Sequence, residues 1–275
     1  MIEHHQKVAM VLLDDATRFA LAGVVGYSET TELFLRLIWM GFVRHGLFSN
    51  LYVDNGSAFS SGDATLIFAR LGIPLVHGTV DYPEGRGKIE RLHRSLRAQL
   101  LRGFKGATDV STAHLQLQLN HHLEHVYNKS PHEALGGETP MQRFLGLRLK
   151  DSPDVDYENL RERFFVSQRR KVSRTNDVKI DGLFYEMPSG YCGRTIIIVK
   201  DVLDGQYFFD HEGKRIQIFP VDQLHNAVTG RDRKDTRVDD ENESGPIDTA
   251  SSRNFRKTYR PIVTPSGDFH EMDET

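Results

Sequence analysis

The stretch that decides the fold runs from Leu51 to Arg97 and contains LYVDNGSAF (51–59) and GTVDYPEGRGKIERLHRSLR (78–97). Its first part is a short apolar strand, and Asp-Asn-Gly breaks this strand sharply at Asp54. Its second part is a helix rich in arginine and lysine, with Glu90 in its first turns. The two acids are separated by residues 55–89, which is 35 residues.

Phosphodiester chemistry requires neutralisation of charge on the attacking and leaving oxygens, and two divalent metal ions held by carboxylates provide it. We predict that Asp54 and Glu90 are catalytic residues and metal ligands that converge on a shared cation. Taken singly, Asp-Asn-Gly after a strand is most often a turn, and a glutamate among arginines is usually a weak surface ion pair. The prediction rests on the combination of strand-end acid, glycine-rich loop and basic helix.

Basic residues gather around these acids although the net charge of the chain is −3, because acids dominate past Asp232. Such residues hold phosphates by charge-assisted hydrogen bonds that weaken with salt. We predict DNA contacts in two groups; a solvated charged face is the alternative for the second. The first group is Arg86, Lys88, Arg91, Arg94 and Arg97, and the second is Arg169, Arg170 and Lys171.

The composition restricts the class of protein and its compartment. Of 275 residues, 39% are hydrophobic and 27% charged, as in a globular protein with a polar tail. The lone Cys192 excludes a disulfide within the chain and a cysteine-based zinc site, which predicts a cytoplasmic protein. We expect Cys192 in the core of a β module. The apolar runs are shorter than a bilayer requires, so no membrane partner is expected.

The first half of the chain alternates strands with helices, which predicts an α/β domain. Apolar runs at Lys7–Leu13 and Phe19–Val25 predict an antiparallel hairpin across a turn at Asp14–Arg18. The glycine-rich segment Gly78–Gly87 is expected to be a mobile loop, followed by a helix over Lys88–Gly103.

From about Phe164 the pattern changes to short β-rich runs separated by Asp-Gly, Ser-Gly and Glu-Gly turns. This pattern predicts a small all-β module, interpreted as a barrel. The polar tail past Thr229 is expected to be disordered. The predicted divisions are a catalytic core (1–105), its helical extension (106–150), a linker (151–163), a small β-barrel (164–227) and a disordered tail (228–275).

Several motifs resemble a known family. LYVDNGSAF, LGIPLVHGTVDYPEGRGKIERLHRSLR and VYNKSPHEALGGETPMQRF resemble the integrase catalytic core of DDE transposases and retroviral-type integrases. VKIDGLFYEMPSGYCGRTIIIVKD followed by FPVDQLHN resembles the C-terminal β-barrel of Mu-type bacterial transposases. The resemblance spans roughly residues 7–226. It implies an RNase H-like fold, two Mg²⁺ or Mn²⁺ ions, and DNA strand cleavage and transfer in transposition or integration.

By match to the family motif, Asp54 is the second catalytic acid and Glu90 the third. In the family the first acid lies on a strand upstream of the hairpin, whereas Asp14-Asp15 matches the later turn. We therefore expect an N-terminally truncated core that lacks the first strand. A surrogate metal-binding role for Asp14 is the alternative. Tyr127, Asn128 and His132 match the family's Y-N-x-x-x-H segment, interpreted as packing together with DNA-backbone contact, or as packing alone.

A missing central strand leaves backbone groups and apolar surface uncovered. We therefore expect marginal solubility or dependence on a partner, either a homo-oligomer or intact transposase subunits, and no strand transfer by this chain alone. The alternative function is a catalytically inactive remnant that binds DNA or a transposase.

Overall fold

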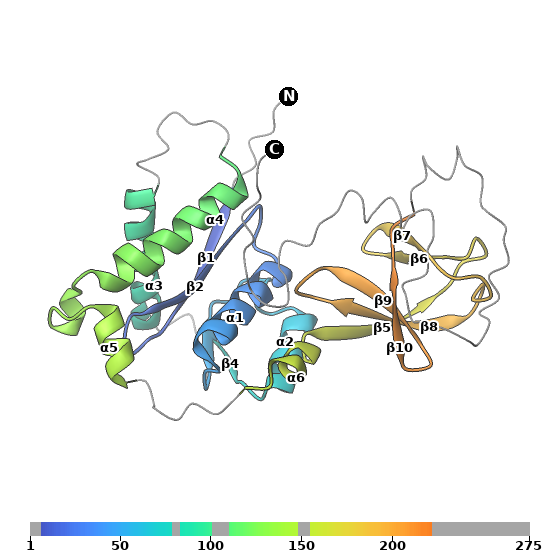
Figure 1. Ribbon diagram of the computed structural model, residues 1–275, viewed down its shortest axis with the longest axis horizontal. Coiled ribbons are helices and arrows are strands. Elements are labelled where there is room, and N and C mark those ends of the chain that lie inside the picture. The colour runs from blue at the N-terminus through green and yellow to red at the C-terminus, as the bar shows by residue number, and fades with distance from the viewer. Residues whose placement is uncertain (1–6, 79–82, 101–109, 148–154, 222–275) are drawn as a thin grey trace. The chain divides into compact units, whose positions relative to one another are not determined.

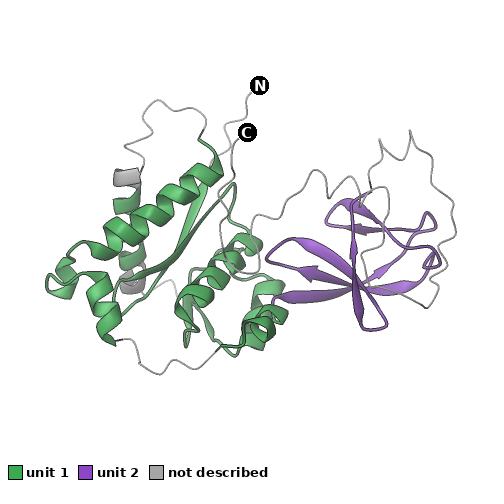
Figure 2. Cartoon of the chain, viewed as in Figure 1, with its two compact units in different colours: residues 1–163 green, residues 164–275 purple. Residues whose placement is uncertain are grey.

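The computed structural model describes residues 7–78, 83–100, 110–147 and 155–221 and divides into two compact units between Arg163 and Phe164 (Figures 1 and 2). The predicted disordered tail, 228–275, lies outside the described residues. The first unit is mixed α/β, as expected. Its main elements are β1 (Val8–Leu13), β2 (Ala20–Gly26), α1 (Thr31–His45), β3 (Leu51–Val53), α2 (Gly62–Leu71), β4 (Leu75–His77), α3 (Pro83–Leu100), α4 (Thr112–His121), α5 (Pro140–Leu147) and α6 (Tyr157–Glu162).

The first two strands form the predicted antiparallel hairpin, with Val8 opposite Gly26 and Leu12 opposite Ala22. Its turn is closed by the carboxylate of Asp14. The Oδ2 atom of Asp14 accepts hydrogen bonds from the Thr17 backbone N–H at 2.9 Å and from the Thr17 hydroxyl at 2.5 Å. The hairpin therefore has a side-chain bond that fixes its turn as well as its strand ladder.

A second sheet is formed by β3 and β4, which are parallel, with Leu51 opposite Leu75 and Val53 opposite His77. Within the described residues β1–β2 and β3–β4 are separate two-stranded sheets. The Ser61 hydroxyl accepts from the Ala64 N–H and so caps α2, the helix that connects β3 with β4. The carboxyl ends of β3 and β4 therefore lie at one edge of their sheet.

Helices α3 and α4 pack on the hairpin through a small apolar cluster. Leu92 and Leu96 of α3 meet three other side chains: Leu119 of α4, Leu123 of the turn that follows α4, and Ala20 of β2. All five are buried. Gly23 of β2 permits this close approach, because a Cβ built there would lie 2.7 Å from Cδ1 of Leu123. The same Cβ would lie 2.9 Å from Cδ2 of Leu119, so the glycine is required by the packing of α4 and of the turn that follows it against the strand.

Side chains also occupy hydrogen-bonding groups of β2. The Asn128 amide accepts from the Ala20 N–H at 2.8 Å and donates to the Ala20 carbonyl at 3.0 Å. Gln116 accepts from the Val25 N–H and donates to the Gly23 carbonyl, both at 2.8 Å. Backbone groups that would lack partners in the apolar interior are thus satisfied by two amides.

One sequence expectation about a connection is wrong. Helix α3 begins at Pro83, so the loop expected over Gly78–Gly87 is helical from that residue on. Proline suits the first turn of a helix, because its missing N–H would have no partner there.

Within the expected linker 151–163, the described residues include a helix, α6. Leu160 of this helix is buried, the Arg161 guanidinium lies 5.5 Å from the centre of the Trp39 ring, and Arg163 donates to the Arg70 carbonyl at 3.0 Å. Helix α6 and Arg163 therefore pack into the first unit.

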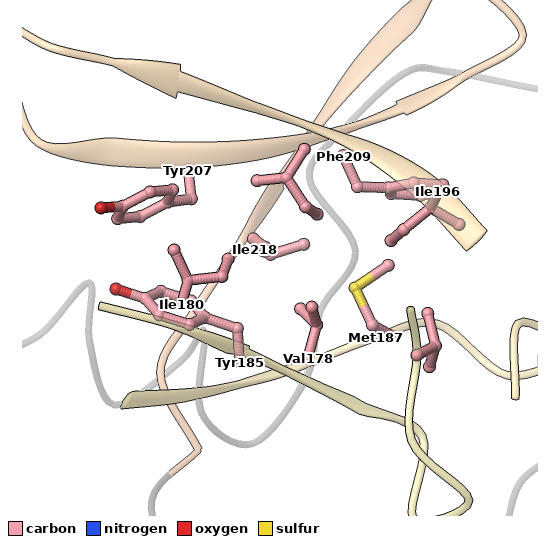
Figure 3. Close-up of a cluster of buried hydrophobic side chains, with 10 residues drawn as sticks. Val178, Ile180, Tyr185, Met187, Ile196, Tyr207, Phe209 and Ile218 are labelled. Atoms are coloured by element: carbon pink, nitrogen blue, oxygen red, sulfur yellow. The ribbon is translucent and has the colours of Figure 1, made fainter. Parts of the chain in front are cut away.

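The second unit consists of strands and turns. A four-stranded antiparallel sheet has the order β10-β9-β8-β5, and β6 and β7 form a separate hairpin. Figure 3 shows side chains of the hairpin facing side chains of the sheet across a common core. The strands are β5 (Phe165–Lys171), β6 (Asp177–Ile180), β7 (Leu183–Glu186), β8 (Thr195–Asp201), β9 (Gln206–His211) and β10 (Lys214–Ile218).

Two hairpins of this unit use the turn chemistry seen in the sequence. Asp181-Gly182 joins β6 to β7 and Glu212-Gly213 joins β9 to β10, and all four residues have positive φ. Turns with two positive φ angles match the twist of antiparallel strands. The expectation for Cys192 is wrong: it is exposed, in a turn-rich segment before β8, so that the sulfur is not part of the core.

Replacing Asn128 with alanine is expected to lower the free energy of unfolding of the first unit by about 2–4 kcal/mol, because two buried backbone groups of Ala20 lose their partners. Urea unfolding followed by the fluorescence of Trp39, the only tryptophan, measures this. Lys129→Ala, at an exposed neighbouring position, is the control and should change stability by less than about 0.5 kcal/mol. Equal stability of both variants would contradict the bridging role.

Candidate functional site

Asp54 lies directly after β3, at the edge where both strands of the parallel sheet end. Its side chain is exposed, and its Oδ1 atom accepts a hydrogen bond from the Gly56 N–H at 2.9 Å. The Gly78 N–H donates to the Val53 carbonyl at 2.8 Å, and Asn55 donates to the Gly78 carbonyl at 3.2 Å. These bonds tie the turn after β3 to the end of β4. Asp54 is therefore held open to solvent on an ordered turn.

Glu90 lies on α3 and is exposed. Ile89, Leu92 and Leu96, on the other side of the helix, pack in the cluster against β2. This periodicity is that of a helix with one apolar stripe, which leaves the charged residues facing solvent. The position of Glu90 is thus fixed by the burial of its apolar neighbours.

The convergence of Asp54 and Glu90 on one cation stays a prediction. Among the described residues, no group of three or more histidine, cysteine, aspartate or glutamate side chains is close enough to hold a metal ion. The structure therefore gives the setting of each acid without defining a complete metal site.

The basic residues of α3 have different surroundings. Arg91 and Arg94 are exposed, as DNA contacts require. The Lys88 ammonium lies 2.5 Å from Oδ1 of Asp15, which connects α3 to the turn of the β1–β2 hairpin. Arg86 and Arg97 belong to the same helix, but their side chains lie outside the described part. Of the five basic residues predicted to contact DNA on α3, Arg91 and Arg94 are thus the two whose described side chains are exposed.

Asp14, the alternative metal ligand, has its Oδ2 atom engaged by Thr17 within the hairpin turn. The carboxylate therefore has a structural role that any metal ion would have to share.

The Y-N-x-x-x-H segment packs against the hairpin. Asn128 is buried and accepts a hydrogen bond from the Ala20 N–H. Tyr127 is partly buried, and this burial raises its pKa. Burial lowers the pKa of His132, and the positive charges of Arg18 and Arg91 lower it further. The segment thus lies near the basic helix, and Asn128 itself has a packing role.

The second basic group is divided by the register of β5. Arg169 and Lys171 are exposed, and they alternate with Arg170, which donates to Oε1 of Gln168 at 2.6 Å. Because successive residues of a strand point to opposite faces, Arg169 and Lys171 share one face and Arg170 lies on the other. A single DNA backbone in contact with one face of the sheet would then meet Arg169 and Lys171 and not Arg170.

Sequence reasoning missed His122. It lies at the start of a π-helical turn, His122–Val126, and is only 7% exposed. Its Nε2 atom has no hydrogen-bond partner among the described residues. Burial lowers its pKa, and the neighbouring His121 lowers it further. Two adjacent histidines are equivalent in sequence until the phase of the helix is known, so no signal distinguished the buried one.

The described residues thus define an α/β unit with a strand-end acid and a basic helix, followed by a β unit. No protein-family model matches the chain. It is 31% identical over 275 residues to the transposase for transposon Tn552 of Staphylococcus aureus, an alignment that covers 93% of this chain and 55% of that protein. It is 26% identical over 174 residues to the Pol polyprotein of equine infectious anemia virus (strain Wyoming), covering 62% of this chain and 13% of that protein.

Among solved structures, the catalytic core domain of BIV integrase matches with a TM-score of 0.39 and 24% identity, covering 51% of this chain and 86% of that domain. The sequence relatives confirm the recognition made from the motifs: the chain is related to DDE-type transposases and retroviral-type integrases. It spans about half the length of the Tn552 transposase. Within the described residues, no helix is long and apolar enough to cross a membrane.

The buried His122 is expected to make stability depend on pH. Its pKa is lowered in the folded state, so the unfolded chain binds more protons below the ordinary value of 6.5. The contribution of neutral His122 is full above that pH and declines as the pH falls toward the folded pKa. His122→Gln should therefore lose less thermal stability than the wild type between pH 7 and pH 5.5, measured as Tm. Equal losses would contradict this assignment, and His125→Gln, at an exposed position, is the control.

Proposed function

We propose that this chain takes part in DNA strand cleavage and transfer during transposition or integration, as a DDE-type core. The observation that carries the proposal is the strand-end carboxylate of Asp54, held open at the carboxyl edge of the β3–β4 sheet. Similarity to the Tn552 transposase supports it over most of the chain. In this proposal Asp54 and Glu90 are the acids of the site.

The donor chemistry of the chain fits a hard divalent cation. Both acids are exposed carboxylates, and carboxylate oxygens with water are the ligands that Mg²⁺ and Mn²⁺ prefer. Asp54 and Glu90 would hold the ions, two of them in an intact site. When bound, such ions stabilise the charge on the attacking and leaving oxygens of a phosphodiester. The chain itself places one carboxylate on a hydrogen-bonded turn and the other on a packed helix.

DNA would be held by residues around these acids. Arg91 and Arg94 are exposed on α3, as is Glu90. Guanidinium groups can donate two hydrogen bonds to the oxygens of one phosphate. Lys88 keeps the start of this surface close to the hairpin through Asp15. In the second unit, proposed to be a Mu-type C-terminal barrel, Arg169 and Lys171 add a further positive surface.

The first acid of the family pattern is proposed to come from outside this set of residues. The carboxylate of Asp14 is used by the hairpin turn, which argues against it as a substitute. An intact transposase subunit would supply it, because further copies of this chain carry the same residues. A cytoplasmic setting suits a chain with one cysteine.

The second candidate is a DNA-binding or transposase-binding remnant without catalytic activity, which the occupied carboxylate of Asp14 favours. Supercoiled plasmid separates the two candidates. The chain is mixed with an intact transposase subunit whose own second acid has been removed. Magnesium-dependent nicking by this mixture that is lost when the chain carries Asp54→Asn supports a catalytic core. Salt-sensitive DNA binding by the chain without nicking in the mixture supports the remnant.

Sharing of a cation by the two acids can be tested without catalysis. Asp54→Asn and Glu90→Gln should each weaken Mn²⁺ binding at least about tenfold, because even indirect metal contacts are worth that much. The double variant should be hardly weaker than either single variant, because both remove the same site. Free Mn²⁺ measured by electron paramagnetic resonance gives the affinity.

Glu29→Gln, which neutralises another exposed acid, is the matched control for Mn²⁺ binding and should leave it unchanged. Independent, additive losses for Asp54 and Glu90 would show that the two carboxylates serve different sites, and would overturn the proposal of a shared cation.

Phosphate contacts by α3 predict a defined salt dependence. Arg91→Gln and Arg94→Gln should each weaken duplex binding regardless of sequence and reduce the slope of log K against log salt by about 1. Fluorescence anisotropy between 50 and 200 mM salt, roughly the range in which such contacts are lost, measures the slope. Arg44→Gln is the control, because Arg44 pairs with Glu124 at 3.0 Å. An unchanged slope would remove these arginines from the DNA interface.

A further inference from the structure

The four-stranded sheet of the second unit has two faces of different character. Ile198 of β8 lies opposite Phe209 of β9, which lies opposite Ile216 of β10. Ile198 and Phe209 belong to the core beneath the β6–β7 hairpin, and Ile216 packs against it. Figure 3 shows Phe209 on the side of the sheet that faces this hairpin. Because neighbouring residues alternate, the residues next to these three along each strand point away from this hairpin. We call this side the outer face.

The register assigns the residues of the outer face. Phe208 lies opposite Val199, and Val199 lies opposite Ser167 of β5. Two residues further along β5, Arg169 lies opposite Ile197. Directly opposed residues of a sheet share a face. The outer face therefore includes Phe165, Arg169, Lys171, Ile197, Phe208 and Arg215.

Aromatic and cationic groups meet on this face. The ring centres of Phe165 and Phe208 are 6.2 Å apart, and the Arg215 guanidinium lies 4.3 Å from the centre of the Phe165 ring. Both phenylalanines keep partial exposure, and Ile197 beside them is 41% exposed. Phenylalanines and a guanidinium are thus grouped where the sheet faces away from its core.

The outer face carries more positive than negative charge, and its exposed charges are cations. Arg169, Lys171 and Arg215 are exposed. The face also has two aspartates that keep their negative charge: Asp201 is buried and accepts from the Leu203 N–H, and Asp210, opposite Arg215, accepts from the Gly213 N–H. Three cations against two carboxylates leave a net charge of +1. A polyanion is therefore the complementary partner.

We propose that the outer face binds unpaired DNA, with bases stacked on Phe165 and Phe208 and phosphates held by Arg169, Lys171 and Arg215. Aromatic side chains can stack on bases only where the bases are splayed out of a duplex, whereas the cations follow the backbone. The combination thus favours a single strand over a duplex. This inference rests on the proposed function in DNA strand transfer and adds the form of DNA that the second unit recognises.

The test compares the full chain and its variants for binding to fluorescein-labelled oligo(dT) and to a duplex of equal length. Phe208→Leu, which keeps an apolar side chain without an aromatic face, should weaken oligo(dT) binding about fivefold or more. Its duplex affinity should not change. Phe208→Tyr keeps an aromatic face and should retain oligo(dT) binding, which separates stacking from a loss of folding.

Charge variants complete the design. Arg169→Gln and Lys171→Gln should weaken both DNA forms, whereas Arg170→Gln, on the opposite face of the same strand, should weaken neither. Equal losses for both DNA forms in Phe208→Leu, or no loss at all, would overturn base stacking while leaving duplex binding and the proposed function intact. Failure of the wild-type chain to bind either DNA form would instead overturn both.

Discussion

The packing of Leu92 and Leu96 against the β1–β2 hairpin is the contact on which the arrangement of the first unit depends. It buries the apolar stripe of α3 together with Leu119 and Leu123. Because that stripe is fixed, the polar side of the helix can carry Glu90, Arg91 and Arg94 in solvent without loss of stability. The Lys88–Asp15 ion pair adds a polar contact between the same two elements. The electrostatic character of the surface is thus a consequence of a small apolar interface beneath it.

Much of this unit was predictable because local chemistry and tertiary packing agree. The apolar runs around Asp14-Asp15 predicted the β1–β2 hairpin, and the break at Asp54 marked the end of β3. The start of α3 was not predictable, since three glycines near Pro83 favour a loop when no tertiary contacts are considered. Helix α6 was missed for a related reason: its stability depends on the burial of Leu160 and on the contact of Arg161 with Trp39 of α1, and neither is visible in the sequence.

The candidate site was predictable only in part. Sequence placed Asp54 at a strand end and Glu90 on a basic helix, and both are exposed there. Their mutual distance depends on how the second sheet and α3 are arranged, and no local pattern specifies such an arrangement. The basic run on β5 shows a similar limit, because consecutive cations divide between two faces as soon as the strand pairs.

The amide bridges along β2 have a consequence for association of the hairpin. Edge strands with open backbone groups are templates for uncontrolled pairing with other chains. Gln116 and Asn128 occupy four such groups on β2, so an incoming strand would have to displace four hydrogen bonds before forming its own. β2 is thereby protected against ordered aggregation. Growth of this sheet by another polypeptide is directed instead to the side of β1, which in the described residues pairs with β2 alone.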